Sequence, residues 1–129
     1  MPVEGSDLAA AAVTYQRLLE HYAGTPAQLD LVQLGLGADG HTASLIPGDP
    51  VLGVRDRDVA LTGEDQGLRR MTLTYPALSR ARARLWLVTG AAKHDALRDL
   101  LAAVGDTPAI SVARGDTIVI ADADALVRP

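Results

Sequence analysis

The sequence predicts an α/β fold, a doubly wound and mostly parallel β-sheet with flanking helices. Three observations lead to it: two long segments carry apolar residues at helical spacing, short runs rich in Leu, Val and Ile lie between them, and glycines and prolines punctuate the joins. Strands that alternate with helices form parallel sheets, because a crossover helix returns the chain to the same edge. With 129 residues, 48% of them hydrophobic, the chain is long enough for a single domain spanning 1–129.

The two long helices are expected at residues 8–22 and 92–104, where Leu, Ala, Val and Tyr recur every three or four positions. In the first helix, Ser6 is a suitable N-cap and Gly24 a suitable stop. In the second, Gly105 is the expected C-cap. Shorter helical turns are expected at residues 41–45, 77–81 and 122–127.

Buried strands are expected at residues 29–34 and 84–89, which are short, apolar and bounded by glycine. Further strands are expected at residues 59–62, 71–75 and 117–120. In open parallel sheets, sites form beyond the carboxyl ends of the strands. The loops after the two buried strands, 35–41 and 90–93, are therefore the candidate site loops.

Composition excludes several classes of function. The formal net charge is −4 and the basic residues are scattered, unlike the basic stripe of a nucleic-acid binder. The chain has no cysteine, so it has neither a disulfide nor a thiolate metal site, and we expect no metal. Its first residues do not follow a signal-peptide pattern, and no apolar run reaches the length of a membrane span. We expect a cytoplasmic protein without nucleic-acid or membrane partners.

The first candidate loop, residues 35–40, reads Gly-Leu-Gly-Ala-Asp-Gly and fits the Gly-x-Gly-x-x-Gly pattern of dinucleotide-binding loops. We reject that function, because Asp39 would place a carboxylate where a pyrophosphate must approach backbone N–H groups. Pro47 also cuts short the helix that should follow, and the irregular stretch beyond it does not accommodate a βαβ unit. The glycines instead allow the backbone to turn tightly; they are Gly35, Gly37 and Gly40.

Such a turn presents Asp39 and His41 together at the end of a strand. An imidazole acts as a general base near neutral pH, and a neighbouring carboxylate orients it or carries its proton onward. No serine lies in a Gly-x-Ser-x-Gly nucleophile elbow, so attack by a His-activated water is favoured over an acyl-enzyme. The alternative is structural, a loop-capping aspartate beside a solvated histidine.

The second candidate loop places Lys93 in the first turn of the expected helix. A cation is unfavourable there unless an anion such as a phosphate binds the helix N-terminus. Arg69 and Arg70 precede an expected strand and could reach the same anion. For Lys93, Arg69 and Arg70 alike, the alternative is a side chain that points into solvent and binds no ligand. For Lys93 the unfavourable interaction with the helix dipole then costs roughly a few tenths of a kcal/mol.

The segment from Gly35 to Gly48, which continues the loop as His-Thr-Ala-Ser-Leu-Ile-Pro-Gly, resembles the signature segment of the 6-phosphogluconolactonase family. Shorter segments resemble other motifs of that family, in the same order along the chain: Arg70–Thr74, Val88–Lys93 and the ending around Asp122. The resemblance covers essentially the whole chain and corresponds to the C-terminal half of the family's proteins. The chain is accordingly expected to represent only part of the family fold.

The resemblance implies hydrolysis of 6-phospho-D-glucono-1,5-lactone to 6-phosphogluconate in the oxidative pentose phosphate pathway. By analogy, His41 activates water for attack on the lactone carbonyl, and Asp39 orients the imidazole or relays its proton. Lys93 and Arg70 would hold the phosphate of the sugar lactone, although the sequence does not decide between Arg69 and Arg70. No metal or organic cofactor is implied.

Three alternatives stay open: a non-catalytic sugar-phosphate-binding module, an inactive fragment, and a glucosamine-6-phosphate isomerase or deaminase. That sister group shares the Asp-Gly-His core but carries an acidic residue just before the Pro-Gly pair, where this chain has Ile46. A sheet that lacks its N-terminal half would also expose an edge strand, which invites pairing with another chain. We therefore expect this chain alone to self-associate or to have low activity.

Overall fold

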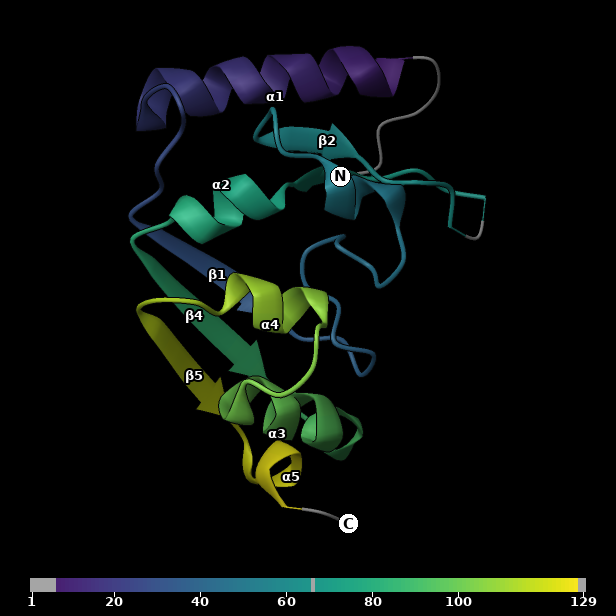
Figure 1. Cartoon of the computed structure of the whole chain (residues 1–129), viewed down its shortest axis with the longest axis vertical. Helices are drawn as coiled ribbons and strands as arrows, with labels where there is room; N and C mark the ends of the chain where they lie inside the picture. The colour runs from purple at the N-terminus through teal and green to yellow at the C-terminus, as the bar shows by residue number, and fades with distance from the viewer. Residues whose placement is uncertain (1–6, 66, 128–129) are drawn as a thin grey trace.

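The computed structural model describes residues 7–65 and 67–127 and contains a three-stranded parallel sheet (Figure 1). Its strands are β1 (Leu31–Gly35), β4 (Ala83–Val88) and β5 (Thr117–Ala121), in the order β1-β4-β5. Parallel pairing on both sides of β4, with helices between the strands, confirms the predicted α/β class.

Four helices cover one face of this sheet: α2 (Tyr75–Arg80), α3 (His94–Ala102), α4 (Pro108–Val112) and α5 (Ala123–Leu126). Alternate side chains of the strands point into this layer and form the core with the helices. The largest of them, Trp86, is completely buried. The other buried members from these elements are Val32, Leu34, Leu78, Val88, Leu97, Leu100, Ala109, Val112 and Ala125.

The opposite face of the sheet is open. Side chains that point to it are largely exposed, and Figure 1 shows no described helix across it. Among the described residues, β1 and β5 each have a strand neighbour on one side only, so they are the edge strands of the sheet. An uncovered face is unusual for a parallel sheet.

The first helix, α1 (Leu8–Ala23), lies apart from the parallel sheet (Figure 1). It packs against a second sheet, in which β2 (Val59–Leu61) pairs antiparallel with β3 (Met71–Leu73). Gly24 closes the helix by donating its N–H to the carbonyl of Glu20 at 3.0 Å, which confirms the predicted stop. The predicted N-cap, Ser6, lies outside the described residues.

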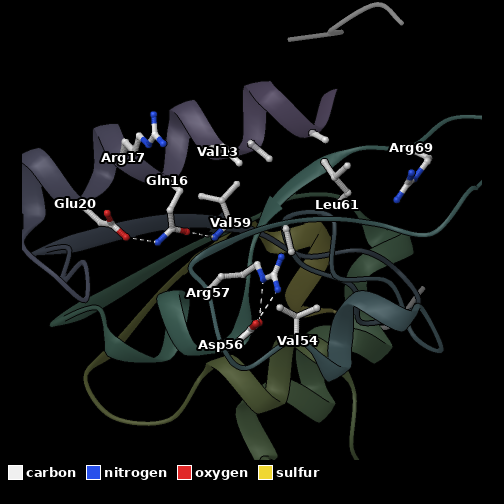
Figure 2. A pocket seen from close by; sticks show the side chains of 13 residues that line it. Val13, Gln16, Arg17, Glu20, Val54, Asp56, Arg57, Val59, Leu61 and Arg69 are labelled. Carbon is white, nitrogen blue, oxygen red and sulfur yellow. Dashed lines mark hydrogen bonds and ion pairs between the residues drawn. The ribbon is translucent and has the colours of Figure 1, made fainter. Parts of the chain in front are cut away.

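Polar contacts join α1 to β2 across the hollow drawn in Figure 2. The Gln16 side-chain oxygen accepts the backbone N–H groups of Asp58 and Val59, each at 2.9 Å. Its amide nitrogen donates to Glu20 at 2.7 Å. These bonds satisfy backbone donors at the start of β2, so the contacts across the hollow hold α1 against β2. Neither member of the predicted catalytic pair lines it.

The predicted helix at residues 41–45 is wrong. Thr42 and Leu45 form an isolated bridge, in which the Leu45 N–H donates to the Thr42 carbonyl at 2.8 Å. Ala43 between them has φ of 51°, a left-handed conformation that cannot continue a right-handed helix. The segment is therefore a tight reverse turn.

The second long helix begins later and ends earlier than predicted. Residues Ala91–Lys93 form a 3₁₀ helix, η3, and α3 starts at His94. The residue that closes α3 in a left-handed conformation is Ala103, with φ of 51°, so Gly105 is not the C-cap. Within the described part of the chain, no helix is long and apolar enough to span a membrane.

Candidate active site

The glycine-rich segment forms a tight loop directly after β1. The Gly37 N–H donates to the His41 carbonyl at 2.8 Å, and the Gly40 N–H donates to the Gly37 carbonyl at 3.0 Å. Gly40 has φ of +80°, a value that glycine adopts without steric cost. The loop thus closes on itself and presents Asp39 and His41 side by side, as the sequence predicts.

The two side chains are hydrogen-bonded. His41 Nδ1 lies 2.6 Å from Asp39 Oδ1, and the backbone N–H of His41 donates to the same oxygen at 3.1 Å. Burial acts to raise the pKa of Asp39, but these two hydrogen bonds and the charge of the imidazolium together lower it below the ordinary value of 3.8. The Asp39 carboxyl group is therefore ionised at neutral pH.

This ionisation fixes the tautomer of His41. An ionised carboxylate only accepts hydrogen bonds, so Nδ1 of the imidazole must carry the proton in the 2.6 Å contact. In the neutral ring, Nε2 is then unprotonated and able to accept a proton. The His41 side chain is 42% exposed, so water or a substrate can reach it. The pair has the arrangement of a general base and its orienting carboxylate.

Gly37 makes room for this pair. A Cβ atom at Gly37 would lie 2.0 Å from His41 Nδ1 and 2.5 Å from Asp39 Oδ1, so any side chain there would displace both groups. The loop is also tied back to its strand, because Thr42 Oγ1 donates to the Gly35 carbonyl at 2.9 Å. The glycine pattern thus serves close packing around the imidazole rather than the approach of a pyrophosphate.

The loop is held from the other side by α4, an element that the sequence analysis missed. The Ala109 N–H donates to the Gly40 carbonyl at 3.0 Å, and the Thr107 side chain packs where a Cβ of Gly40 would lie, 2.6 Å from it. The signal available in the sequence was Pro108, since proline is favoured in the first turn of a helix. Contact between such distant segments is not visible in the sequence pattern.

Replacing Gly40 with alanine should destabilise the fold more than the same change at Gly48. Both glycines have nearly equal positive φ, +80° and +82°, so both variants carry backbone strain of about 1 kcal/mol. Only at Gly40 does the new methyl group meet Thr107, and forced overpacking adds roughly 1–3 kcal/mol. Urea unfolding of both variants measures the difference, and equal losses would contradict the contact with α4.

Acid should weaken the contribution of Asp39 to stability. Because its pKa is lower in the folded state, that contribution is complete above the ordinary value of 3.8 and is lost as pH falls through the folded-state value. We expect Asp39→Asn to be less stable than the wild type at neutral pH and to match it in strong acid. Unfolding curves across this pH range test the prediction; a constant difference would refute it.

Lys93 is the last residue of η3, five residues after Val88, with which β4 ends. Because β1 and β4 are parallel neighbours, with Gly35 beside Leu87, the loops that follow them emerge at the same edge of the sheet. Lys93 forms no ion pair with any described residue. The structure thus places Lys93 at the same edge of the sheet as the loop of Asp39 and His41, although no hydrogen bond or ion pair between described residues joins it to either.

Arg70 occupies a different position. It precedes β3 in the second sheet, and its Nη1 lies 3.3 Å from Asp65 Oδ2. Arg69 donates its Nε–H to the Thr62 carbonyl at 3.2 Å. Neither arginine contacts Asp39 or His41 in the described structure. Arg70 therefore has an acidic partner already, which an incoming phosphate would have to displace or share.

One hydrogen bond connects the glycine-rich loop to the second sheet. The Ser44 N–H donates to Thr72 Oγ1 at 3.2 Å, and Ser44 lines the same hollow as Arg70.

No group of three or more His, Cys, Asp or Glu residues within the described ranges could hold a metal ion. The ionisable groups that the structure joins in the glycine-rich loop are the carboxylate of Asp39 and the imidazole of His41.

Comparison with known proteins identifies the relatives of this chain. The family model described as glucosamine-6-phosphate isomerases/6-phosphogluconolactonase matches residues 1–120. The chain belongs to this family. A 6-phosphogluconolactonase of Synechocystis sp. is 42% identical over 110 residues, which cover 82% of this chain and 45% of that protein. One of Mycobacterium bovis is 36% identical over an alignment of 135 positions, covering 96% of this chain and 53% of that protein.

Family membership agrees with the fold. The crystal structure of 6-phosphogluconolactonase from Thermotoga maritima matches with a TM-score of 0.69 at 32% identity, over 88% of this chain and 50% of that one. This chain of the isomerase/lactonase family thus spans about half the length of the relatives it matches. The resemblance inferred from residues 35–48 is confirmed at the level of the family.

Proposed function

We propose that this chain carries the catalytic base of a 6-phosphogluconolactonase, which hydrolyses 6-phospho-D-glucono-1,5-lactone to 6-phosphogluconate. The single observation that carries the proposal is the 2.6 Å contact between His41 Nδ1 and the ionised Asp39, which leaves Nε2 as a free base. The names of the 36–42% identical relatives support the substrate class. A cytoplasmic place for the reaction, in the oxidative pentose phosphate pathway, stays a prediction.

In the proposed mechanism, His41 Nε2 takes a proton from a water molecule as the water oxygen attacks the lactone carbonyl carbon. The tetrahedral intermediate then expels the ring oxygen, which takes the proton back from the imidazolium. The bond between the carbonyl carbon and the ring oxygen breaks, and the net change is addition of one water. Asp39 stabilises the imidazolium between the two steps and holds the ring in its reactive orientation.

For the phosphate we propose Lys93 as the first partner, because its loop emerges at the same sheet edge as the catalytic loop and no described carboxylate neutralises it. Arg70 is the second, and it would have to turn away from Asp65. Gly35, Gly37 and Gly40 hold the loop and contribute no functional group. The mechanism requires neither a metal nor an organic cofactor.

The test follows acid release from freshly prepared lactone, with the spontaneous rate in buffer subtracted. A lactonase raises the rate above that of the buffer. A non-catalytic sugar-phosphate-binding module instead leaves the rate unchanged, while 6-phosphogluconate raises its Tm, since a ligand that binds only the folded state stabilises it. An inactive fragment shows neither effect. Either of the last two results would overturn the proposal.

The sister activity is tested in parallel with glucosamine 6-phosphate and an ammonia assay. Opening and isomerising an amino sugar needs additional acid and base groups. Leu45 is completely buried and Ile46 is half-buried beside it, so the two positions directly before Pro47 offer apolar side chains only. We expect no ammonia release, and release at a rate above that of lactone hydrolysis would reassign the site to the isomerase branch.

A further inference from the structure

The loop after β4, which carries Lys93, is tied to the turn after β5 by the side chain of Asp122. The Gly90 N–H donates to both oxygens of this carboxylate, each at 3.0 Å. The Ala125 N–H donates to Asp122 Oδ1 at 2.8 Å, which caps α5. A carboxylate offers several lone pairs, so one half-buried side chain holds both turns at once.

Gly90 passes this restraint on to Lys93. The chain turns sharply out of β4 at Gly90, where φ is +92°, a value that glycine adopts without steric cost. While the Gly90 N–H is held by Asp122, the Gly90 carbonyl accepts the Lys93 N–H at 3.0 Å. Asp122 is therefore joined to the backbone of Lys93 by hydrogen bonds through a single intervening residue.

The residue after Lys93 is held by the same turn. His94 Nδ1 lies 3.1 Å from the carbonyl oxygen of Ala125, and because a carbonyl only accepts, Nδ1 carries the proton in this contact. Both η3 and α3 contact α5, which lies beside α3 in Figure 1. With its backbone fixed before and after, Lys93 has only its side chain left to order when a ligand binds, which lowers the entropy lost on binding.

We propose that Asp122 is a positioning residue for the phosphate of the substrate, which it serves by holding the backbone of Lys93. The inference rests on the proposed function, in which Lys93 binds that phosphate. The charge of a carboxylate opposes an anion nearby, so Asp122 acts here through the hydrogen bonds that it accepts. The sign of the effect separates the two roles: loss of the charge alone would tighten phosphate binding, whereas loss of position weakens it.

The experiment compares two substitutions that keep different bonds. Asp122→Ser keeps a hydroxyl that caps α5, because serine is a favoured N-cap residue, but the shorter side chain does not reach Gly90. Asp122→Ala loses both bonds. We expect KM for the phosphorylated lactone to rise roughly tenfold in both variants with kcat little changed, while the Tm falls further in Asp122→Ala. Hydrolysis of glucono-1,5-lactone, which carries no phosphate, should be unaffected in both.

Three further variants serve as controls. Asp122→Asn should recover most of the lost affinity, because its amide oxygen can accept the Gly90 N–H. Asp124→Ser removes a carboxylate from the same turn and should keep the wild-type KM, since Asp124 is exposed and forms no hydrogen bond or ion pair with another described residue. In a Lys93→Ala background, Asp122→Ser should add no further rise in KM, because its effect passes through Lys93.

Three results would overturn the proposal: an unchanged or lower KM in Asp122→Ser, an equal loss with the unphosphorylated lactone, or the same additional rise in the Lys93→Ala background. A rise in Lys93→Ala without one in Asp122→Ser overturns this proposal alone. An unchanged KM in Lys93→Ala also removes Lys93 from the proposed function. Calorimetric dissociation constants for 6-phosphogluconate give the same comparison without turnover, and a wild-type chain that neither binds nor hydrolyses overturns both proposals.

Discussion

Replacing His41 with glutamine is expected to lower kcat for lactone hydrolysis roughly 10²- to 10⁴-fold, the contribution typical of a positioned general base. Glutamine can still donate a hydrogen bond to Asp39, so the loop keeps its shape, but it accepts no proton near neutral pH. KM should change little, because the imidazole assists the transition state rather than holding the substrate. The measurement is the initial rate of acid release over a range of lactone concentrations.

His21→Gln is the control for this prediction. His21 is exposed on α1 and contributes nothing to the catalytic loop, so this variant should retain the wild-type rate. The pH profile adds a second readout. Asp39 remains ionised throughout the neutral range, so its protonation does not account for a fall of kcat there, and any such fall should be absent from His41→Gln. An unchanged kcat in that variant would exclude His41 as the base.

Replacing Gly37 with alanine is expected to abolish most of the proposed lactonase activity without altering Asp39 or His41. The new Cβ would lie 2.0 Å from His41 Nδ1, and real contacts of that kind do not occur, so the ring or the loop must move. Movement breaks the 2.6 Å hydrogen bond that sets the tautomer and orientation of the imidazole. We expect a loss of kcat of roughly 10²-fold or more, because misplacement by about 1 Å is sufficient for such a loss.

Gly35→Ala is the matched control, since no heavy atom of the described residues, apart from Gly35 and its two neighbours in the chain, lies within 4 Å of the Cβ position at that glycine. The Gly37→Ala variant should also unfold more easily, by roughly 1–3 kcal/mol, if the loop absorbs the strain. Nuclear magnetic resonance of the imidazole nitrogens reports directly on the pair, because the Nδ1 proton shifts when its carboxylate acceptor is lost. A Gly37→Ala chain with the wild-type nitrogen spectrum and wild-type kcat would show that the close packing is unimportant.

The candidate site divides into a part that the sequence predicts and a part that it does not. The Asp39–His41 contact is local, because both residues belong to one loop whose glycines impose a tight turn. Their pairing was therefore predictable from spacing alone. The contact of Gly40 with Thr107 joins segments that are far apart in the chain, and no local pattern encodes it. The acidic partner of Arg70 is likewise visible only once the turn before β3 is folded.

The same division holds for the fold. The helix α1 and the strand β4 are recognisable from the sequence alone. The first has apolar residues at helical spacing, and the second is a short apolar run of the kind typical of a buried strand. The helix expected at residues 41–45 was wrong because a turn with positive φ at Ala43 satisfies the same backbone groups. The short helix α4 was missed because five residues carry too little periodicity to be recognised.

The sequence by itself thus determined the α/β class, the strands and the pairing of Asp39 with His41, because each depends on neighbouring residues. Only the tertiary structure decided which side of the sheet is covered. The strands are apolar on both sides, so their pattern predicts burial on both, yet α2 to α5 all pack on one side. Which face a helix covers depends on the handedness and order of the connections, and these are properties of the folded chain.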